Sequence, residues 1–194
     1  MIGGYPPRIM DITDLPYKIA VLCYIHDSEG RTLLLHRNKM PNKGLYSPIG
    51  GKLEVTIGES PTTCALREIQ EETGLIILKE HLHLSGIVSE TAYQHETHWL
   101  IFLYDVVQPV ELEPHEMNEG YLDWYTNEEI AELPLPETDK KIIQPLRERY
   151  LGGFFMVHID CSGPEMTYRV EQEFLPHNPH NPHNPHKIKH AVKK

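Results

Sequence analysis

The sequence is poor in cysteine. Its three cysteines, Cys23, Cys64 and Cys161, lie far apart within apolar stretches. Cysteines placed in this way are typical of buried thiols in a reducing compartment. The pattern excludes a disulfide framework of the kind that stabilises small secreted domains, and it argues against a zinc site built from these residues.

Long apolar runs are also missing. No stretch approaches the roughly 18 apolar residues that a membrane-spanning helix requires, and residues 1–10 lack the apolar run of a signal peptide. We therefore expect a soluble, cytoplasmic protein without a membrane partner.

Basic residues are outnumbered, with 18 Lys and Arg against 28 Asp and Glu and a formal net charge of -10. Binding to duplex nucleic acid depends on clustered basic side chains that displace counterions from phosphates. The composition therefore argues against a duplex-binding surface. Any phosphate-bearing ligand would therefore have to be held locally, with the help of a metal ion.

What the chain does contain is typical of a globular protein. Of its 194 residues, 40% are hydrophobic and 24% are charged, which predicts one main domain with an appendage. We expect an N-terminal segment over residues 1–16, the main domain over 17–150 and a β-hairpin extension over 151–175. Residues 176–194 form a tail rich in His, Asn and Pro that ends in basic residues. That composition predicts disorder. The alternative is a polyproline II segment whose regularly spaced histidines capture zinc or nickel weakly.

The expected elements are of mixed type. Turn residues at 27–30 predict a β-hairpin from strands at 17–26 and 31–37, followed by a structured, glycine-rich loop over 38–58. Ser60, Pro61 and Gly74 are residues that favour the two ends of one helix. Further strands are expected at 82–89, 98–107 and 121–125, helices at 127–132 and 139–150, and a second hairpin at 154–161 and 166–174. The fold class is α+β.

Three glutamates of the first helix share one face. Glu68, Glu71 and Glu72 stand at positions i, i+3 and i+4, so their carboxylates repel one another. A hard divalent cation compensates such a cluster, because Mg²⁺ prefers oxygen ligands. The alternative for any two of these residues is a solvated helix face.

The surrounding segment resembles the signature of the Nudix hydrolase family. Arg67-Glu68, Glu71-Glu72 and Gly74-Leu75 match the second half of that signature at every position, and Glu59 stands eight residues before Arg67. In the first half, seven residues rather than five separate Gly51 from Glu59. We expect the two additional residues to form a bulge around 55–57, which leaves the helix unchanged. The resemblance implies the Nudix fold, a mixed β-sheet sandwiched between helices.

The resemblance also implies roles for individual residues. Glu68, Glu71 and Glu72 would bind the metal, which would be Mg²⁺ or alternatively Mn²⁺, with the carbonyl of Gly50 as a further ligand. Arg67 and Glu59 would form a supporting pair that orients the carboxylates, although an ordinary surface salt bridge is the alternative. The candidate catalytic residues are Glu68, Glu72 and Glu119. Glu116 is an alternative to Glu119, and both could instead be solvated loop residues.

The range of possible substrates is narrowed mainly by elimination. Relatives that cleave ADP-ribose often carry a proline about fifteen residues after the signature, whereas the first proline after Leu75 is Pro109. Tyr93 lies near the position of a tyrosine found in hydrolases of dinucleoside polyphosphates, but an aromatic residue in a strand commonly serves packing. The remaining expectation is a nucleoside triphosphate or oxidised-purine pyrophosphohydrolase.

Candidate substrate-binding residues are Arg37, Lys52 and Asp139. Thr138 or Asp139 would read the base edge from the start of the last helix, or would merely cap that helix. Alternatives for the whole protein are a hydrolase of dinucleoside polyphosphates or nucleotide sugars, a nucleotide-sensing domain without turnover, and a structural protein with an acidic helix. The complete set of three glutamates favours catalysis. The sequence is also compatible with a homodimer.

Overall fold

The computed structural model describes residues 15–40 and 42–175. Their strands form a six-stranded mixed sheet and a four-stranded antiparallel sheet. The strands of the larger sheet, in spatial order, are β10 (Thr167–Phe174), β9 (Phe154–Asp160), β5 (Leu82–Tyr93), β6 (Thr97–Val106), β1 (Tyr17–Tyr24) and β4 (Ile49–Lys52). Those of the smaller sheet are β3 (Tyr46–Ser47), β2 (Thr32–Arg37), β8 (Gly120–Tyr125) and β7 (His115–Met117).

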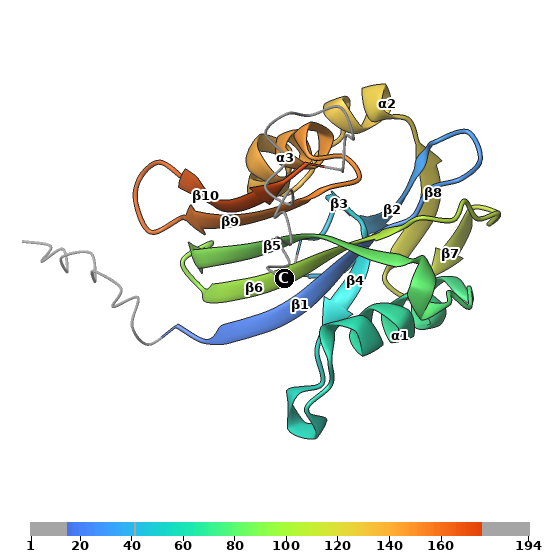
Figure 1. Cartoon of the computed structure of the whole chain (residues 1–194), viewed down its shortest axis with the longest axis horizontal. Helices are drawn as coiled ribbons and strands as arrows, with labels where there is room; N and C mark the ends of the chain where they lie inside the picture. The colour runs from blue at the N-terminus through green and yellow to red at the C-terminus, as the bar shows by residue number, and fades with distance from the viewer. Residues whose placement is uncertain (1–14, 41, 176–194) are drawn as a thin grey trace, which may run out of the picture.

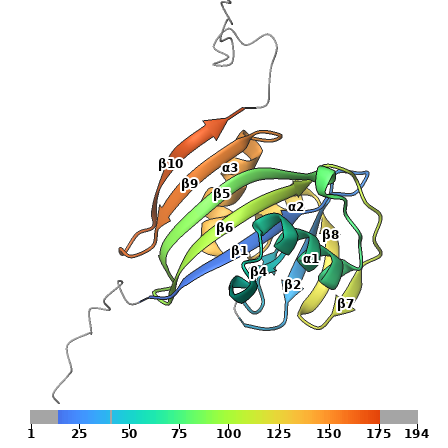
Figure 2. The same ribbon diagram turned by 60° about the horizontal axis from the view of Figure 1, so that its bottom comes forward.

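Helices lie on both sides of the six-stranded sheet (Figures 1 and 2). On one side is α1 (Pro61–Thr73); on the other are the π-helical turn η4 (Asp139–Ile143) and α3 (Gln144–Arg149). The remaining helical segments are η2 (Val55–Ile57), η3 (Lys79–His81) and α2 (Asn127–Glu132). The expected α+β class, with a mixed sheet between helices, is confirmed.

Strand β1 lies at the centre of this arrangement. Val21 and Cys23 are buried against α1 and the smaller sheet. Tyr24, on the opposite face of the strand, is buried against η4 and α3. Because successive strand residues face opposite sides, a strand covered on both faces must be apolar almost throughout. This explains the apolar run of β1 from Ile19 to Tyr24.

Helix α1 begins and ends where its local residues predict. The backbone N–H of Thr63 donates to the hydroxyl of Ser60 at 3.2 Å, and Pro61 occupies the first turn. Gly74 ends the helix in the left-handed conformation, with φ of 73°, which costs glycine little. The buried side of α1 is formed by Cys64, Ala65, Ile69 and Thr73.

The loop segment in which the two additional residues were expected forms η2. This short 3₁₀ turn spans Val55–Ile57 and ends at Gly58, whose φ is 67°. The expected bulge is therefore confirmed, and it precedes α1 without altering the helix.

The predicted hairpin over residues 17–37 is wrong. A turn is present at residues 27–30, but β1 and β2 belong to different sheets and share only the bridge between His26 and Thr32. β1 pairs instead with β4 and β6, while β2 pairs with β3 and β8. Apolar periodicity and turn residues predict that two strands exist, but long-range packing decides which strands they pair with.

Strands β3, β4 and β7 were not predicted, because each has only two to four residues. β4 also contains two glycines and β7 a glutamate, which resemble loop sequence. The C-terminal hairpin is present: β9 and β10 pair antiparallel, and β9 also pairs parallel with β5, so the hairpin extends the large sheet. The expectations for residues 1–14 and for the tail from residue 176 lie outside the described residues.

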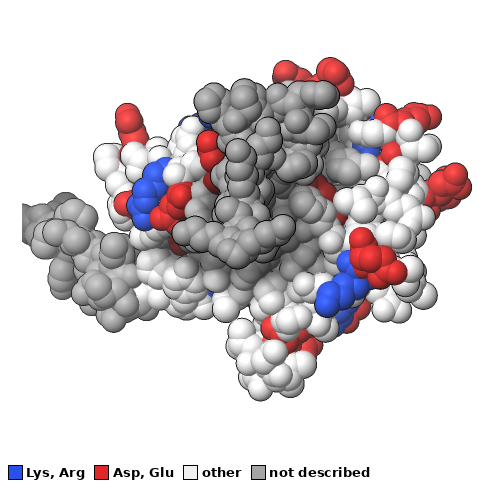
Figure 3. Space-filling model, viewed as in Figure 1, with Lys and Arg blue, Asp and Glu red and all other residues white. Residues whose placement is uncertain are grey.

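Charged side chains are mixed on the face shown in Figure 3, where the described basic groups lie beside acidic ones. Within the described ranges, no helix combines the length and apolar character needed to cross a membrane.

Candidate active site

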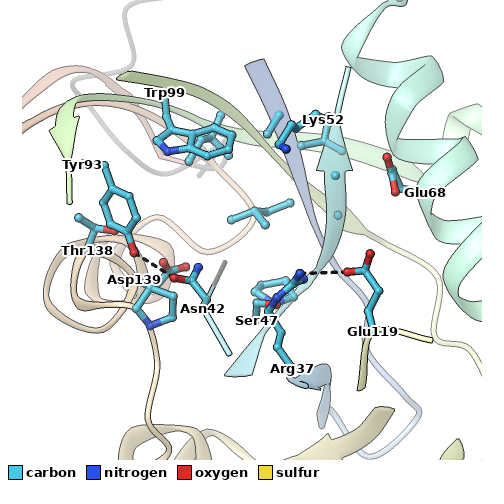
Figure 4. A pocket seen from close by; sticks show the side chains of 18 of the residues that line it. Arg37, Asn42, Ser47, Lys52, Glu68, Tyr93, Trp99, Glu119, Thr138 and Asp139 are labelled. Atoms are coloured by element: carbon cyan, nitrogen blue, oxygen red, sulfur yellow. Dashed lines mark hydrogen bonds and ion pairs between the residues drawn. The ribbon is translucent and has the colours of Figure 1, made fainter. Parts of the chain in front are cut away.

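A cavity of about 500 Å³ lies between the two sheets and the start of η4. Glu68 and Glu119 lie at one end of it, while Tyr93, Trp99 and Asp139 lie at the other (Figure 4). Its volume is within the range of small-molecule binding sites, which is roughly 300–1,000 Å³. The two ends differ in chemistry.

Two glutamates of α1, Glu68 and Glu72, face this cavity beside strand β4. The glycines of β4 permit their close approach, because a Cβ added to Gly51 would lie 2.1 Å from Oε1 of Glu68. A side chain at position 51 would therefore displace the Glu68 carboxylate.

The backbone of Gly50 also faces this end. Leu53 N–H donates to the carbonyl of Ile19 on β1 at 3.0 Å, so alternate residues of β4 turn their backbone groups toward β1 and the residues between them turn away. Gly50 is one of the residues whose backbone groups turn away from β1, and its N–H stabilises the charged form of Glu72. Because the N–H and C=O of one strand residue point to the same side, the Gly50 carbonyl is directed away from β1 as well.

Glu72 is the most perturbed carboxylate of the helix. Burial, followed by the neighbouring charges of Glu68 and Glu119, raises its pKa to about 8. Its Oε2 atom is buried and has no hydrogen-bond partner among the described residues. An uncompensated buried carboxylate is unfavourable, and a cation is the partner that relieves both the burial and the repulsion.

Arg67 links the supporting carboxylates. Its Nε and Nη2 atoms donate to the two oxygens of Glu59, both at 2.9 Å, and its Nη1 atom donates to Glu68 at 2.8 Å. The hydrogen bonds from Arg67 hold the pKa of Glu59 at about 2. The Glu59 side chain is only 3% exposed, so the pair is better shielded than an ordinary surface salt bridge.

Glu71 lies apart from the other two glutamates. Its side chain is 59% exposed and pairs with Arg67 Nη1 at 3.1 Å, and it does not line the cavity. Across residues 15–40 and 42–175, no three acidic, imidazole or thiol groups converge as a completed metal site. The structure brings Glu68, Glu72 and Gly50 together but leaves Glu71 outside.

The remaining candidates reach the cavity from distant parts of the chain. Arg37 and Glu119 both line it and form an ion pair at 3.0 Å across 82 residues of sequence. Lys52 and Asp139 also line it, whereas Glu116 lies on β7 outside it.

Thr138 does not cap the last helix with its side chain. Its backbone is already helical and its hydroxyl makes no capping hydrogen bond. It instead hydrogen-bonds Glu90, favouring the charged form of that carboxyl. The capping role considered for Thr138 is therefore wrong.

Sequence reasoning missed Glu90 and Trp99, and it left Tyr93 as a packing residue. In a regular strand, residues 90 and 93 would face opposite sides. The pairing of β5 with β6 shifts register between them, and Ala92 has φ of 54°, so both residues line the cavity. The one sequence feature that could have identified Glu90 was its charge within a run of otherwise apolar or small residues.

The residues at the glutamate end fit a hard divalent cation. They offer carboxylate oxygens and an outward-facing backbone carbonyl, and one buried carboxylate oxygen lacks a partner. Oxygen donors of this kind match the preference of Mg²⁺ or Mn²⁺.

A glutamate-bearing helix thus lies beside a glycine-rich strand at one end of a cavity large enough for a nucleotide. The family model described as NUDIX domain matches residues 16–146. Because this match spans most of the chain, the protein belongs to the Nudix family and is a pyrophosphohydrolase that acts on nucleotide-type substrates. Nudix hydrolases are in general dependent on a divalent metal.

Individual relatives agree with this assignment. The chain is 27% identical over 117 residues to the uncharacterized Nudix hydrolase YvcI of Bacillus subtilis, a match covering 60% of this chain and 71% of that protein. A MutT protein of Bacillus halodurans superposes with a TM-score of 0.63 at 26% identity, covering 79% of this chain and 97% of the other. The NUDIX domain of Shewanella oneidensis NrtR, solved with ADP ribose, shares the fold with a TM-score of 0.56 at 19% identity, covering 75% and 94% of the two chains.

Proposed function

We propose that the protein hydrolyses a pyrophosphate bond of nucleoside triphosphates, including oxidised purine nucleotides, with Mg²⁺ as the cofactor. The observation that carries the proposal is the unpartnered Oε2 of Glu72, buried beside Glu68 at one end of a cavity of about 500 Å³. Mn²⁺ has similar ligand preferences and is the alternative cofactor.

Glu68, Glu72 and the Gly50 carbonyl would hold the metal ion, and Glu71 would join them from the outer edge. When bound, the metal neutralises phosphate charge and favours attack by water. Arg67 and Glu59 orient Glu68, because the guanidinium binds both carboxylates at once. Such supporting contacts fix the direction of a ligand oxygen.

Glu119 is the proposed general base. It lines the cavity at the same end as Glu68 and Glu72, and its ion pair with Arg37 holds its carboxylate in place. A general base must lie within hydrogen-bond reach of the attacking water. Glu116, on β7, does not line the cavity.

Arg37 and Lys52 are the proposed phosphate-binding residues. Both line the cavity, so their positive charges can neutralise part of the negative charge of a triphosphate. Asp139, at the far end, would then lie near the base. The cytoplasmic location, the division into domains and the homodimer stay predictions.

Magnesium-dependent release of phosphate or pyrophosphate should be measured over a panel of nucleoside triphosphates, 8-oxo-purine nucleotides, dinucleoside polyphosphates, nucleotide sugars and ADP-ribose. We expect turnover of triphosphates that is abolished by EDTA and restored by Mg²⁺ or Mn²⁺. Preferred turnover of ADP-ribose or of a dinucleoside polyphosphate would replace the proposed substrate class. Tight nucleotide binding without turnover of any compound would identify a sensing domain instead.

A further inference from the structure

Glu90 is a buried carboxyl group that none of the roles above uses. It lies on β5, its residue is only 4% exposed, and it lines the end of the cavity away from Glu68. Its Oε1 atom has no hydrogen-bond partner among the described residues. A buried oxygen without a partner is costly, so its retention at a cavity wall points to a ligand that supplies the missing donor.

The neighbours of Glu90 restrict what that donor can be. Thr138 hydrogen-bonds Glu90, and Asp139 lies close enough to repel its charge. The basic residues that line the cavity within the described ranges are Arg37, which is paired with Glu119, and Lys52, which lies between Trp99 and Glu68 (Figure 4). Arg147, whose charge acts on Asp139, is paired with Asp105 at 2.6 Å. Because two carboxylates, Glu90 and Asp139, lie together here, this end of the cavity favours a neutral group rich in N–H donors and disfavours phosphate.

Aromatic side chains flank the same position. Tyr93 and Trp99 both line this end, and Tyr93 O–H donates to Asn42 Oδ1 at 3.4 Å. Planar bases stack on such side chains. The register shift between Glu90 and Tyr93 is what brings a carboxylate and an aromatic ring to the same wall.

Among the common nucleobases, one pairing edge presents two adjacent N–H donors. Guanine offers N1–H beside the 2-amino group, whereas adenine, cytosine and uracil place an acceptor next to each donor. A carboxylate accepts through two oxygens and can bind both guanine donors together. Oxidation of guanine at C8 leaves this edge unchanged.

We infer that Glu90 is a specificity-determining residue that selects a guanine-type base by accepting hydrogen bonds from N1–H and the 2-amino group. The inference deepens the proposed function and rests on it for the orientation of the nucleotide, with phosphates toward Glu68. Asp139 accepts from its own backbone N–H and contributes negative charge, while Thr138 holds Glu90 in position.

Inosine nucleotides provide the decisive comparison, because hypoxanthine differs from guanine only by lacking the 2-amino group. kcat/KM should be measured for dGTP, dITP and dATP with the wild type, Glu90→Gln and Glu137→Gln. Glu137 is the matched control, since it is an exposed carboxylate on the neighbouring turn that does not line this cavity. We expect the wild type to prefer dGTP over dITP by roughly 10- to 100-fold, which is the range for a hydrogen bond to a charged group.

In Glu90→Gln that ratio should fall close to unity, mainly through KM, while Glu137→Gln keeps the wild-type ratio. A wild type that does not discriminate, or a Glu90→Gln variant that keeps full discrimination, overturns the inference. GMP and IMP binding, measured calorimetrically without metal, separates the two proposals. A Glu90-dependent preference for GMP in a protein that hydrolyses no triphosphate refutes the proposed function alone, whereas triphosphate hydrolysis with equal binding of GMP and IMP refutes the inference alone.

Discussion

The carboxylate of Glu68 occupies the space that a side chain on Gly51 would need. A Cβ at position 51 would lie 2.1 Å from Oε1 of Glu68, whereas a Cβ at the preceding residue, Gly50, would lie 2.1 Å from the backbone oxygen of Val21. The two neighbouring glycines are therefore required for different reasons. One makes room for a flexible side chain, and the other makes room for the backbone of a central strand.

This difference predicts opposite outcomes for the two alanine variants. Gly51→Ala should fold normally, because Glu68 can rotate away, but its kcat should fall by about 100-fold, as expected for a displaced catalytic group. Gly50→Ala should lose about 1–3 kcal/mol of unfolding free energy, because backbone atoms must shift. Urea denaturation and steady-state kinetics on both variants test this. Equal stability losses would show that the strand is more adaptable than its contacts indicate.

The three glutamates of α1 should contribute unequally to kcat. Glu68→Gln and Glu72→Gln should each lower kcat by roughly 100- to 1,000-fold, because each removes a negative oxygen ligand at the site of charge neutralisation. Glu71→Gln should cost less, since its side chain is largely exposed and lies outside the cavity. Turnover of all three should be compared at saturating Mg²⁺. Near wild-type rates for Glu68→Gln or Glu72→Gln would show that the metal site has been misplaced.

The ion pair between Glu59 and Arg67 predicts a contribution to acid stability. The pKa of Glu59 is lowered from its ordinary value of 4.5 to about 2. The pair therefore stabilises the folded state above pH 4.5, and this stabilisation is lost as the pH falls toward 2. Glu59→Gln should show a weaker loss of unfolding free energy over this window, measured by urea denaturation at a series of pH values. Identical pH slopes for the two proteins would contradict the pairing.

The buried carboxyl group of Glu90 should make the stability of the folded protein depend on pH in the opposite direction. Burial raises its pKa from 4.5 to about 7, so the folded state keeps a proton that the unfolded state releases. Stability should fall as the pH rises from about 4.5 to about 7. Glu90→Gln removes this penalty and should be more stable than the wild type by about 1–3 kcal/mol at alkaline pH, with Asp139 leaving some slope in the variant. Unfolding free energies at acid and alkaline pH measure the difference. A variant less stable than the wild type at high pH would mean that the carboxylate is compensated within the fold.

Much of the cavity end that contains Glu68 and Glu72 could be predicted, because the sequence features that define it lie within one short segment. Ser60, Pro61 and Gly74 determine the bounds of α1 through hydrogen bonds and backbone angles of neighbouring residues. Residues 68 and 72 share a face of any helix that contains them. The bulge at residues 55–57 was predictable for the same reason, since an insertion between two well-defined elements must be accommodated in the loop.

Other features depended on contacts that sequence spacing does not encode. The separation of β1 from β2 follows from pairing with strands far along the chain. The position of Glu71 outside the cavity follows from how α1 packs, because i, i+3 and i+4 spacing defines a broad helix face but not which of its residues meet the cavity.

The sequence by itself determined the ends of α1 and its acidic face, and its resemblance to the Nudix signature predicted the class of chemistry, because all of these depend on residues close together in the chain. Only the tertiary structure decided how the cavity is assembled. Arg37 meets Glu119 across 82 positions, and a shift in strand register carries both Glu90 and Tyr93 to one wall. The physical reason is that local hydrogen bonding fixes individual elements, whereas the burial of apolar surface selects among many possible packings of those elements, and that packing places the polar groups that would read a base.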